Sequence, residues 1–85
     1  MKNFNYIITD EIGIHARPAG LIVAITKKYA SKITIKANKK IADGTNLMAI
    51  IALAVKKGTT VTVSAKGQDD ELVIAELEEL FKSYL

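Results

Sequence analysis

Six residues near the middle of the chain, Lys32 to Ala37, alternate strictly between polar and apolar side chains. In an extended chain, the two isoleucines of this segment face one way, while its lysines and Thr34 face the other. A period of two residues predicts a strand with one face in the core and the other in water. Before and after the strand, apolar residues also recur at helical spacing. A half-exposed sheet covered by helices on its other face is therefore predicted, which is a two-layer α+β fold.

The other segments extend this prediction to four strands and three helices in the order β-α-β-β-α-β-α. Strands are expected at residues 4–9, 32–37, 40–42 and 60–65, and helices from residue 15 or 16 to 30, at 47–55, and from 67–71 onward. Pro18 suits a first helical turn, where an N–H group would have no helical partner. The buried stripe of the last helix is predicted to be Val73, Leu77, Leu80, Phe81 and Tyr84. Short loops favour a largely antiparallel sheet with all helices on one face.

The length and composition bound the class of protein. With 85 residues, of which 49% are hydrophobic, residues 1–85 are expected to form a single domain. The absence of cysteine excludes disulfides, thiolate zinc sites and cysteine nucleophiles. The first residues lack the apolar run of a signal peptide, and the longest apolar stretch, residues 47–55, is too short to cross a bilayer. We therefore expect a soluble, cytoplasmic protein without direct insertion into a membrane.

The charged residues are unevenly distributed along the chain. The net charge is +3, yet six of the nine acidic residues lie between Asp69 and Glu79, while basic residues dominate from Lys27 to Lys57. This distribution favours an anionic ligand or an acidic protein partner. A small nucleic-acid-binding domain is one alternative, but the expected sheet lacks the exposed aromatic side chains on which such domains stack bases.

The run Gly-Ile-His-Ala-Arg-Pro-Ala at residues 13–19 falls where the first helix is expected to begin. A lone histidine is usually structural or simply exposed, and an arginine in a first turn can be merely solvated. Here His15 would lie beside free backbone N–H groups, those of Ala16 and Arg17, which together with the helix dipole attract an anion. The Arg17 guanidinium suits phosphate oxygens, and an imidazole is an effective nucleophile near neutral pH. The run predicts a nucleophile inside an anion-binding turn.

The surroundings of the histidine limit what it can do. The chain has no second histidine, and the only acidic residues near the run are Asp10 and Glu11. A self-contained hydrolase or a metal site would need a further base or more ligands. We therefore expect neither a metal nor a cofactor, and we expect a residue that accepts and holds a phosphoryl group rather than an enzyme that acts alone on a small substrate.

The segment at residues 47–55 is apolar on all sides, although a helix on one face of a single sheet buries only one side. It is in part a core helix, with Ile50 and Leu53 expected to point inward. The apolar side chains left near the surface would form a docking patch for partner proteins. The residues of this patch are Leu47, Met48 and Ile51, extended by Gly20 and Leu21, one turn beyond the histidine.

The run at residues 13–19, followed by Leu47-Met48, Lys57-Gly58 and the strand with its following glycine at residues 61–67, resembles the HPr family over essentially the whole chain. These are histidine-containing phosphocarriers of the phosphoenolpyruvate-dependent sugar phosphotransferase system. The resemblance implies an open-faced β-sandwich of four antiparallel strands and three helices. It also implies that His15 accepts a phosphoryl group on Nδ1 from phosphorylated enzyme I and passes it to sugar-specific IIA domains. Arg17 would steady the phosphoryl group, and successive partners would share the apolar patch of a monomeric protein.

One departure from the family concerns regulation. Many members carry a regulatory serine at the N-cap of the second helix, where this chain has Asn46. Asparagine caps a helix as well as serine does, but it has no hydroxyl to phosphorylate. Control by HPr kinase/phosphorylase at this position is therefore not expected, although the adjacent Thr45 is a conceivable substitute. A second hypothesis within the family is a paralogue with a mainly regulatory role that lacks the serine switch.

Overall fold

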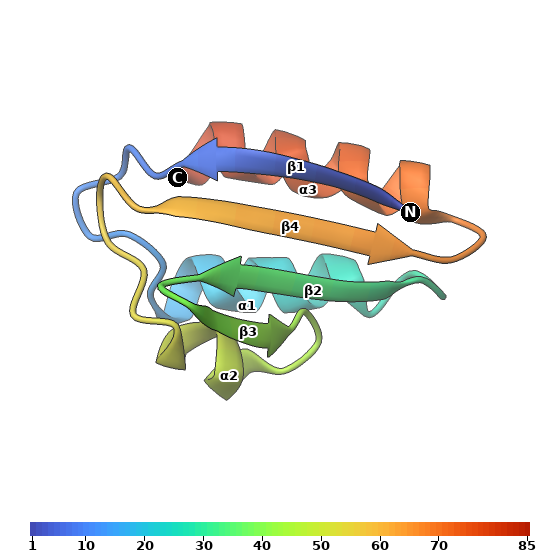
Figure 1. Cartoon of the computed structure of the whole chain (residues 1–85), viewed down its shortest axis with the longest axis horizontal. Coiled ribbons are helices and arrows are strands. Elements are labelled where there is room, and N and C mark those ends of the chain that lie inside the picture. The colour runs from blue at the N-terminus through green and yellow to red at the C-terminus, as the bar shows by residue number, and fades with distance from the viewer.

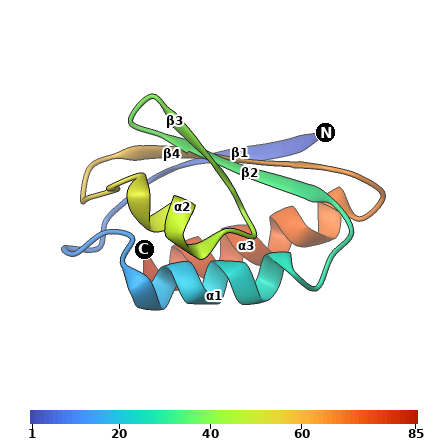
Figure 2. The ribbon, with the colours of Figure 1, turned by 90° about the horizontal axis from the view of Figure 1, so that it is seen from below.

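The computed structural model describes residues 1–85, with four strands and three helices in the predicted order. The strands are β1 (Lys2–Ile7), β2 (Lys32–Ala37), β3 (Lys40–Asp43) and β4 (Thr60–Lys66). The helices are α1 (Ala16–Thr26), α2 (Leu47–Ala52) and α3 (Asp70–Tyr84). The strands form one antiparallel sheet in the order β1-β4-β2-β3 (Figure 1). Figure 2 shows the helices on one face of this sheet, which confirms the predicted two-layer, open-faced β-sandwich.

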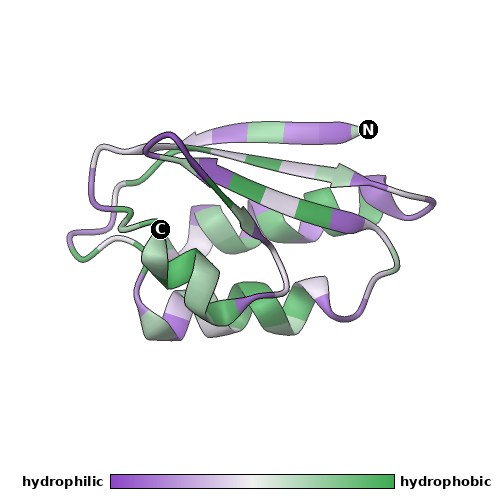
Figure 3. Ribbon diagram, turned by 60° about the horizontal axis from the view of Figure 1, so that its bottom comes forward, coloured by the Kyte–Doolittle hydropathy of each residue, from purple (hydrophilic) through white to green (hydrophobic).

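Alternation along the central strands decides which face of the sheet is covered. In β2, Ile33 and Ile35 are buried, and they lie opposite the buried Ala65 and Val63 of β4. The polar residues between them lie on the open face, as the hydropathy colouring of the strands illustrates (Figure 3). Burial of an isoleucine or valine side chain contributes about 1.5–3 kcal/mol. The apolar face of the sheet therefore holds the helix layer in place.

Helix α2 is shorter than predicted: it begins at Leu47 as expected but ends at Ala52 instead of Val55. The backbone of Ala54 adopts a left-handed conformation, with φ of 54°, which no α-helix continues. The freed carbonyl groups of Leu53 and Ala54 accept hydrogen bonds from Asn38 Nδ2, at 2.9 and 3.2 Å. Asn38 lies in the β2–β3 turn, so the end of this helix depends on a residue distant in sequence.

Two further expectations are corrected. Helix α1 ends at Thr26 rather than at Ala30, and the Thr26 hydroxyl donates hydrogen bonds to the carbonyl oxygens of Val23 and Gly44 at 3.1 and 2.7 Å. Tyr84 is 52% exposed instead of buried, whereas the neighbouring Phe81 and Leu85 are the residues that enter the core at this end of α3. The other predicted members of the α3 stripe are buried: Val73, Leu77, Leu80 and Phe81.

The strand boundaries agree closely with the prediction, and those of β2 agree at both ends. The exception is β1, which covers residues 2–7 instead of 4–9. The turn between β2 and β3 contains Asn38 and Lys39, whose φ angles are 52° and 63°. Two successive positive φ angles are typical of a type I′ turn, the connection that matches the twist of a two-residue hairpin. No helix of the structure is long and apolar enough to span a membrane.

Candidate functional site

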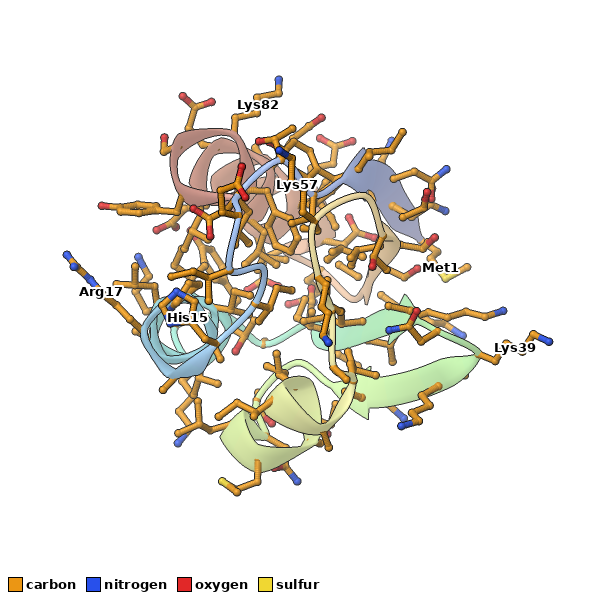
Figure 4. All side chains as sticks on the ribbon, turned by 90° about the vertical axis from the view of Figure 1, so that its left-hand side faces the viewer. Met1, His15, Arg17, Lys39, Lys57 and Lys82 are labelled. Atoms are coloured by element: carbon orange, nitrogen blue, oxygen red, sulfur yellow. The ribbon has the colours of Figure 1, made fainter.

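His15 is the N-cap residue of α1, at the end of the molecule where the β1–α1 and α2–β4 loops meet (Figures 1 and 4). Its backbone is extended, with φ of −124° and ψ of −169°, and its carbonyl oxygen accepts the first helical hydrogen bond from Ala19 at 3.0 Å. Its side chain caps no N–H group of the helix, forms no other hydrogen bond within the chain, and is half-buried. The imidazole is therefore available for chemistry instead of being used to stabilise the fold.

The first turn of α1 provides N–H groups around this imidazole. The N–H groups of Ala16 and Arg17 precede the first hydrogen bond of the helix and have no backbone acceptor. Pro18, the third helical residue, has no N–H group to leave unpaired and is buried. Neither Asp nor Glu lies in the first turn to neutralise the positive end of the helix dipole. This geometry can hold an anion such as a phosphoryl group beside the imidazole.

Gly13 fixes the backbone that leads into the histidine. Its φ is +79°, and a Cβ atom built on it would lie 2.2 Å from the carbonyl oxygen of Val55 and 2.7 Å from Cα of Lys56. The next residue, Ile14, donates its N–H group to the same Val55 oxygen at 3.1 Å and is buried. The absence of a side chain thus allows the two loops to touch.

The loop before Gly13 is held by contacts that the sequence analysis missed. Asp10 Oδ2 accepts hydrogen bonds from the N–H groups of Ile12 and Gly13 at 3.0 and 3.2 Å. The carbonyl oxygen of Leu85 accepts hydrogen bonds from the N–H groups of Thr9 and Asp10 at 2.5 and 2.9 Å. An aspartate two residues before a turn is a local signal that sequence reasoning could have used. The contact with Leu85 joins the two ends of the chain and leaves no such signal.

Two cationic side chains at this end of the molecule, those of Arg17 and Lys57, differ in their partners. Figure 4 shows the Arg17 side chain pointing away from the body of the molecule. Arg17 is exposed and forms no ion pair. Lys57, in the α2–β4 loop, pairs with Glu11 at 2.9 Å and neutralises one of the two carboxylates next to the site. Arg17 is therefore the free cation of the first turn, and its guanidinium suits the recognition of phosphate oxygens.

The apolar residues predicted as a docking patch lie on neighbouring helices α1 and α2 (Figure 2). Ile50 and Leu53 point into the core, with exposed fractions of 0 and 2%, while Met48 is 69% exposed. The patch residues are the exposed Leu47 and Met48 and the half-buried Ile51, Gly20 and Leu21. The structure thus confirms that Ile50 and Leu53 face inward and leaves Leu47 and Met48 exposed, while Leu21 lines the hollow between α1 and α3. Ile12, which is 66% exposed, adds an apolar side chain that the sequence analysis did not consider.

Asn46 caps α2 as predicted: its side-chain oxygen accepts a hydrogen bond from the N–H group of Ala49 at 3.1 Å. The neighbouring Thr45 donates its hydroxyl and its N–H group to Asp43 Oδ1, at 2.7 and 2.8 Å. These hydrogen bonds hold the pKa of the Asp43 carboxyl below its usual value. The Thr45 hydroxyl is thus already engaged by a carboxylate.

The surface around His15 is open. The structure has two hollows, of about 330 and 140 Å³, and His15 lines neither of them. The larger hollow lies between α1 and α3, and the smaller one lies on the open face of the sheet. No cluster of three or more His, Asp or Glu side chains could hold a metal ion. A small substrate would therefore find no enclosed pocket next to the imidazole.

An open-faced β-sandwich with a lone, unpaired histidine at the start of its first helix defines a class of small phosphoryl-group carriers. The family model of the phosphorylation site of the phosphotransferase-system component HPr matches residues 2–83. The phosphocarrier protein HPr of Mycoplasma capricolum is 39% identical over 79 residues, which cover 93% of this chain and 89% of that protein. The chain belongs to the HPr family, whose members are phosphocarriers and not enzymes.

Solved structures agree with this assignment. The histidine-containing phosphocarrier protein of a mycoplasma matches this fold with a TM-score of 0.93 at 36% identity, over 96% of this chain and 93% of that one. An HPr dimer from Thermoanaerobacter tengcongensis matches with a TM-score of 0.77 at 36% identity, over 98% of this chain and 95% of that one. The four-stranded sheet with three helices is therefore the fold of this family.

Proposed function

We propose that His15 accepts a phosphoryl group on Nδ1 from phosphorylated enzyme I and transfers it to sugar-specific IIA domains. The observation that carries this proposal is the unpaired imidazole at the N-terminus of α1, outside any pocket. A nucleophile that has an anion site but neither a base nor a substrate cavity suits a relay between proteins. Family membership supports partners from the phosphotransferase system.

The first turn of α1 stabilises the transferred group. In the phosphorylated state, the N–H groups of Ala16 and Arg17 would donate hydrogen bonds to phosphoryl oxygens, and the Arg17 guanidinium would add a charge-assisted contact. The transfer breaks the bond between phosphorus and the atom of enzyme I that carries it and forms a bond between phosphorus and Nδ1 of His15. Partners would dock on the apolar patch, defined by Gly20, Leu21, Leu47, Met48 and Ile51, which lies one turn away. In this account the carrier acts as a cytoplasmic monomer, because the patch must be free for each partner in turn.

Regulation is the point at which this chain departs from many relatives. Asn46 caps α2 without a hydroxyl, so HPr kinase/phosphorylase finds no acceptor at this position. Thr45 is a poor substitute because its hydroxyl is bonded to the Asp43 carboxylate. The same observation favours a second candidate function, a paralogue with a regulatory role that lacks the serine switch. Restoration of sugar uptake in a strain without its main carrier separates the two candidates.

The direct test is phosphorylation by enzyme I and phosphoenolpyruvate, followed by addition of a IIA domain. We expect one acid-labile phosphoryl group per chain, which the IIA domain removes. His15→Ala should abolish labelling while the circular dichroism spectrum stays unchanged. Arg17→Ala should retain the acceptor and lower kcat/KM for transfer by about tenfold or more, the loss expected for one charge-assisted hydrogen bond. Labelling of the His15→Ala protein at the parental level would refute the assignment.

A further inference from the structure

The smaller hollow lies on the open face of the sheet, where β2 begins and β4 ends. It has a volume of about 140 Å³, and its side-chain lining comes chiefly from Lys32 and Thr34 of β2 and from Ser64 and Lys66 of β4. In Figure 1 the arrowhead of β4 lies at the opposite end of the molecule from the loops that hold His15. The hollow is therefore separate from the phosphoryl site described above.

Two lysines face each other across this hollow. Lys32 and Lys66 are directly opposite in the β2–β4 register, and both are exposed. Side chains in that relation have Cβ atoms about 4.5–5.5 Å apart, and like charges there destabilise a sheet. Neither ammonium group has a carboxylate within 4.0 Å, whereas Lys2, Lys28 and Lys57 are all paired. The two positive charges of the hollow thus lie together without a direct ion-pair partner, and the carboxylate that attracts Lys32 at longer range is that of Asp43.

Two hydroxyl groups complete the lining. Thr34 and Ser64 are the next directly opposed pair on the same face, and both are half-buried. Neither hydroxyl forms a hydrogen bond with another group of the chain, whereas that of Thr62, further along β4, donates to Asn5 Oδ1 at 2.7 Å. Four side chains whose donor groups bind no other group of the chain therefore line one hollow. A water molecule occupies about 30 Å³ of the liquid, so the hollow accommodates an ion with four oxygen atoms.

We infer that Lys32, Thr34, Ser64 and Lys66 form a binding site for a phosphate dianion, either as the free ion or as the terminal group of a phosphate monoester. An anion between the two ammonium groups removes their repulsion and accepts charge-assisted hydrogen bonds from both. Asp70 already forms an ion pair, at 3.5 Å, with the N-terminal ammonium of Met1, which also lines the hollow. Asp43 lies directly opposite Thr34 on β3. Its carboxylate accepts two hydrogen bonds from Thr45 and attracts Lys32 only at long range, so it forms no ion pair with either lysine.

The test is a titration of the ¹⁵N-labelled full chain with inorganic phosphate at constant ionic strength, maintained with sodium chloride. We expect saturable shifts of the amide resonances of Thr34, Ser64 and Lys66, and a rise in Tm with phosphate. Lys66→Gln should weaken this binding by about tenfold, the value of one charge-assisted hydrogen bond. Lys36→Gln is the matched control, because Lys36 is also exposed on β2 but lies opposite Thr62, outside the hollow.

A second measurement guards against a variant that is merely unfolded. In phosphate-free buffer, Lys66→Gln should be at least as stable to urea as the parent chain, because it loses a like-charge contact, and phosphate should no longer raise its Tm. A parallel titration with glycerol phosphate distinguishes the two sources. If glycerol phosphate binds as tightly as inorganic phosphate, the site accepts a phosphate monoester. If it binds more weakly, the free ion is the ligand.

Three outcomes would overturn the inference: equal shifts with chloride alone, no saturation, or equal losses in the Lys36→Gln and Lys66→Gln proteins. The anion-binding turn at His15 is followed separately in the same spectra, through the amides of Ala16 and Arg17. Failure at the sheet therefore leaves the phosphoryl-carrier proposal intact, and failure at the turn leaves the sheet site intact.

Discussion

At the scale of single residues, the site depends on two neighbours with opposite roles. His15 contributes no side-chain hydrogen bond to the fold, whereas Gly13 contributes the absence of a side chain. The contact between Gly13 and the Val55 carbonyl holds the loop that carries the imidazole. Gly13, which has no reactive side chain, thus fixes the position of the reactive His15.

Gly13→Ala should destabilise the chain by at least about 1–3 kcal/mol, because alanine at a positive φ is strained and its Cβ would overlap the Val55 oxygen. Gly20→Ala is the control, since a Cβ atom there meets nothing within 4 Å. In mid-helix this second change should stabilise the chain by about 0.5–1 kcal/mol. Urea unfolding measures both. If the two substitutions changed the free energy of unfolding equally, the close contact at Gly13 would make no specific contribution to stability.

At the scale of secondary-structure elements, the agreement with sequence-based expectations varies for physical reasons. The ends of β2 were predicted correctly because polar and apolar side chains alternate along its consecutive residues. The end of α2 was not, because propensity favours helix through Val55 while the left-handed Ala54 and the hydrogen bonds from Asn38 stop it. The short, contiguous run around His15 made the position of this residue at the start of α1 predictable.

The N-cap of α2 provides a test at this scale. Asn46→Ala removes the hydrogen bond to the N–H group of Ala49 and should cost about 1 kcal/mol of stability. Asn46→Ser restores a capping oxygen and should return the stability to within a few tenths of a kcal/mol of the parent. Chemical denaturation of the three proteins measures this. If the alanine variant were as stable as the parent, the cap would contribute nothing to the helix.

At the scale of the whole molecule, distant segments are joined by side chains that no local pattern predicts. The Asp69 carboxylate accepts hydrogen bonds from the N–H groups of Ala30 and Ser31, at 2.8 and 2.9 Å, and from the Ser31 hydroxyl. These contacts join the start of α3 to the loop between α1 and β2. The contact of Leu85 with Thr9 and Asp10 similarly joins the end of the chain to the loop before His15. Because such contacts join residues distant in sequence, the way in which the loop before His15 is held could not be predicted from the sequence.

The Asp69 contacts predict how stability depends on pH. The Ser31 hydroxyl, followed by the Ala30 N–H group, lowers the pKa of the Asp69 carboxyl in the folded chain. Because the folded-state pKa lies below the unfolded one, this stabilisation is complete above the ordinary aspartate pKa and is lost as the pH falls through the lower value. Asp69→Asn should therefore be less stable than the parent at neutral pH and should lose less stability on acidification.

The measurement is urea unfolding at a series of pH values from neutral to acidic. Glu79→Gln is the control, because Glu79 is exposed and has neither an ion-pair nor a hydrogen-bond partner. Its pH profile should follow that of the parent chain. Parallel profiles for the parent and the Asp69→Asn protein would contradict the role given to these hydrogen bonds.

The central claim concerns one atom, Nδ1 of His15, and it is tested most directly by NMR of the phosphorylated chain. After reaction with enzyme I and phosphoenolpyruvate, the phosphorus should couple to Nδ1 of the His15 ring, with one phosphoryl group per chain. The amides of Ala16 and Arg17 should shift at the same time, as hydrogen bonds to the phosphoryl oxygens form. A phosphoryl group on Nε2, on a hydroxyl such as that of Thr45, or on no residue at all would contradict the account.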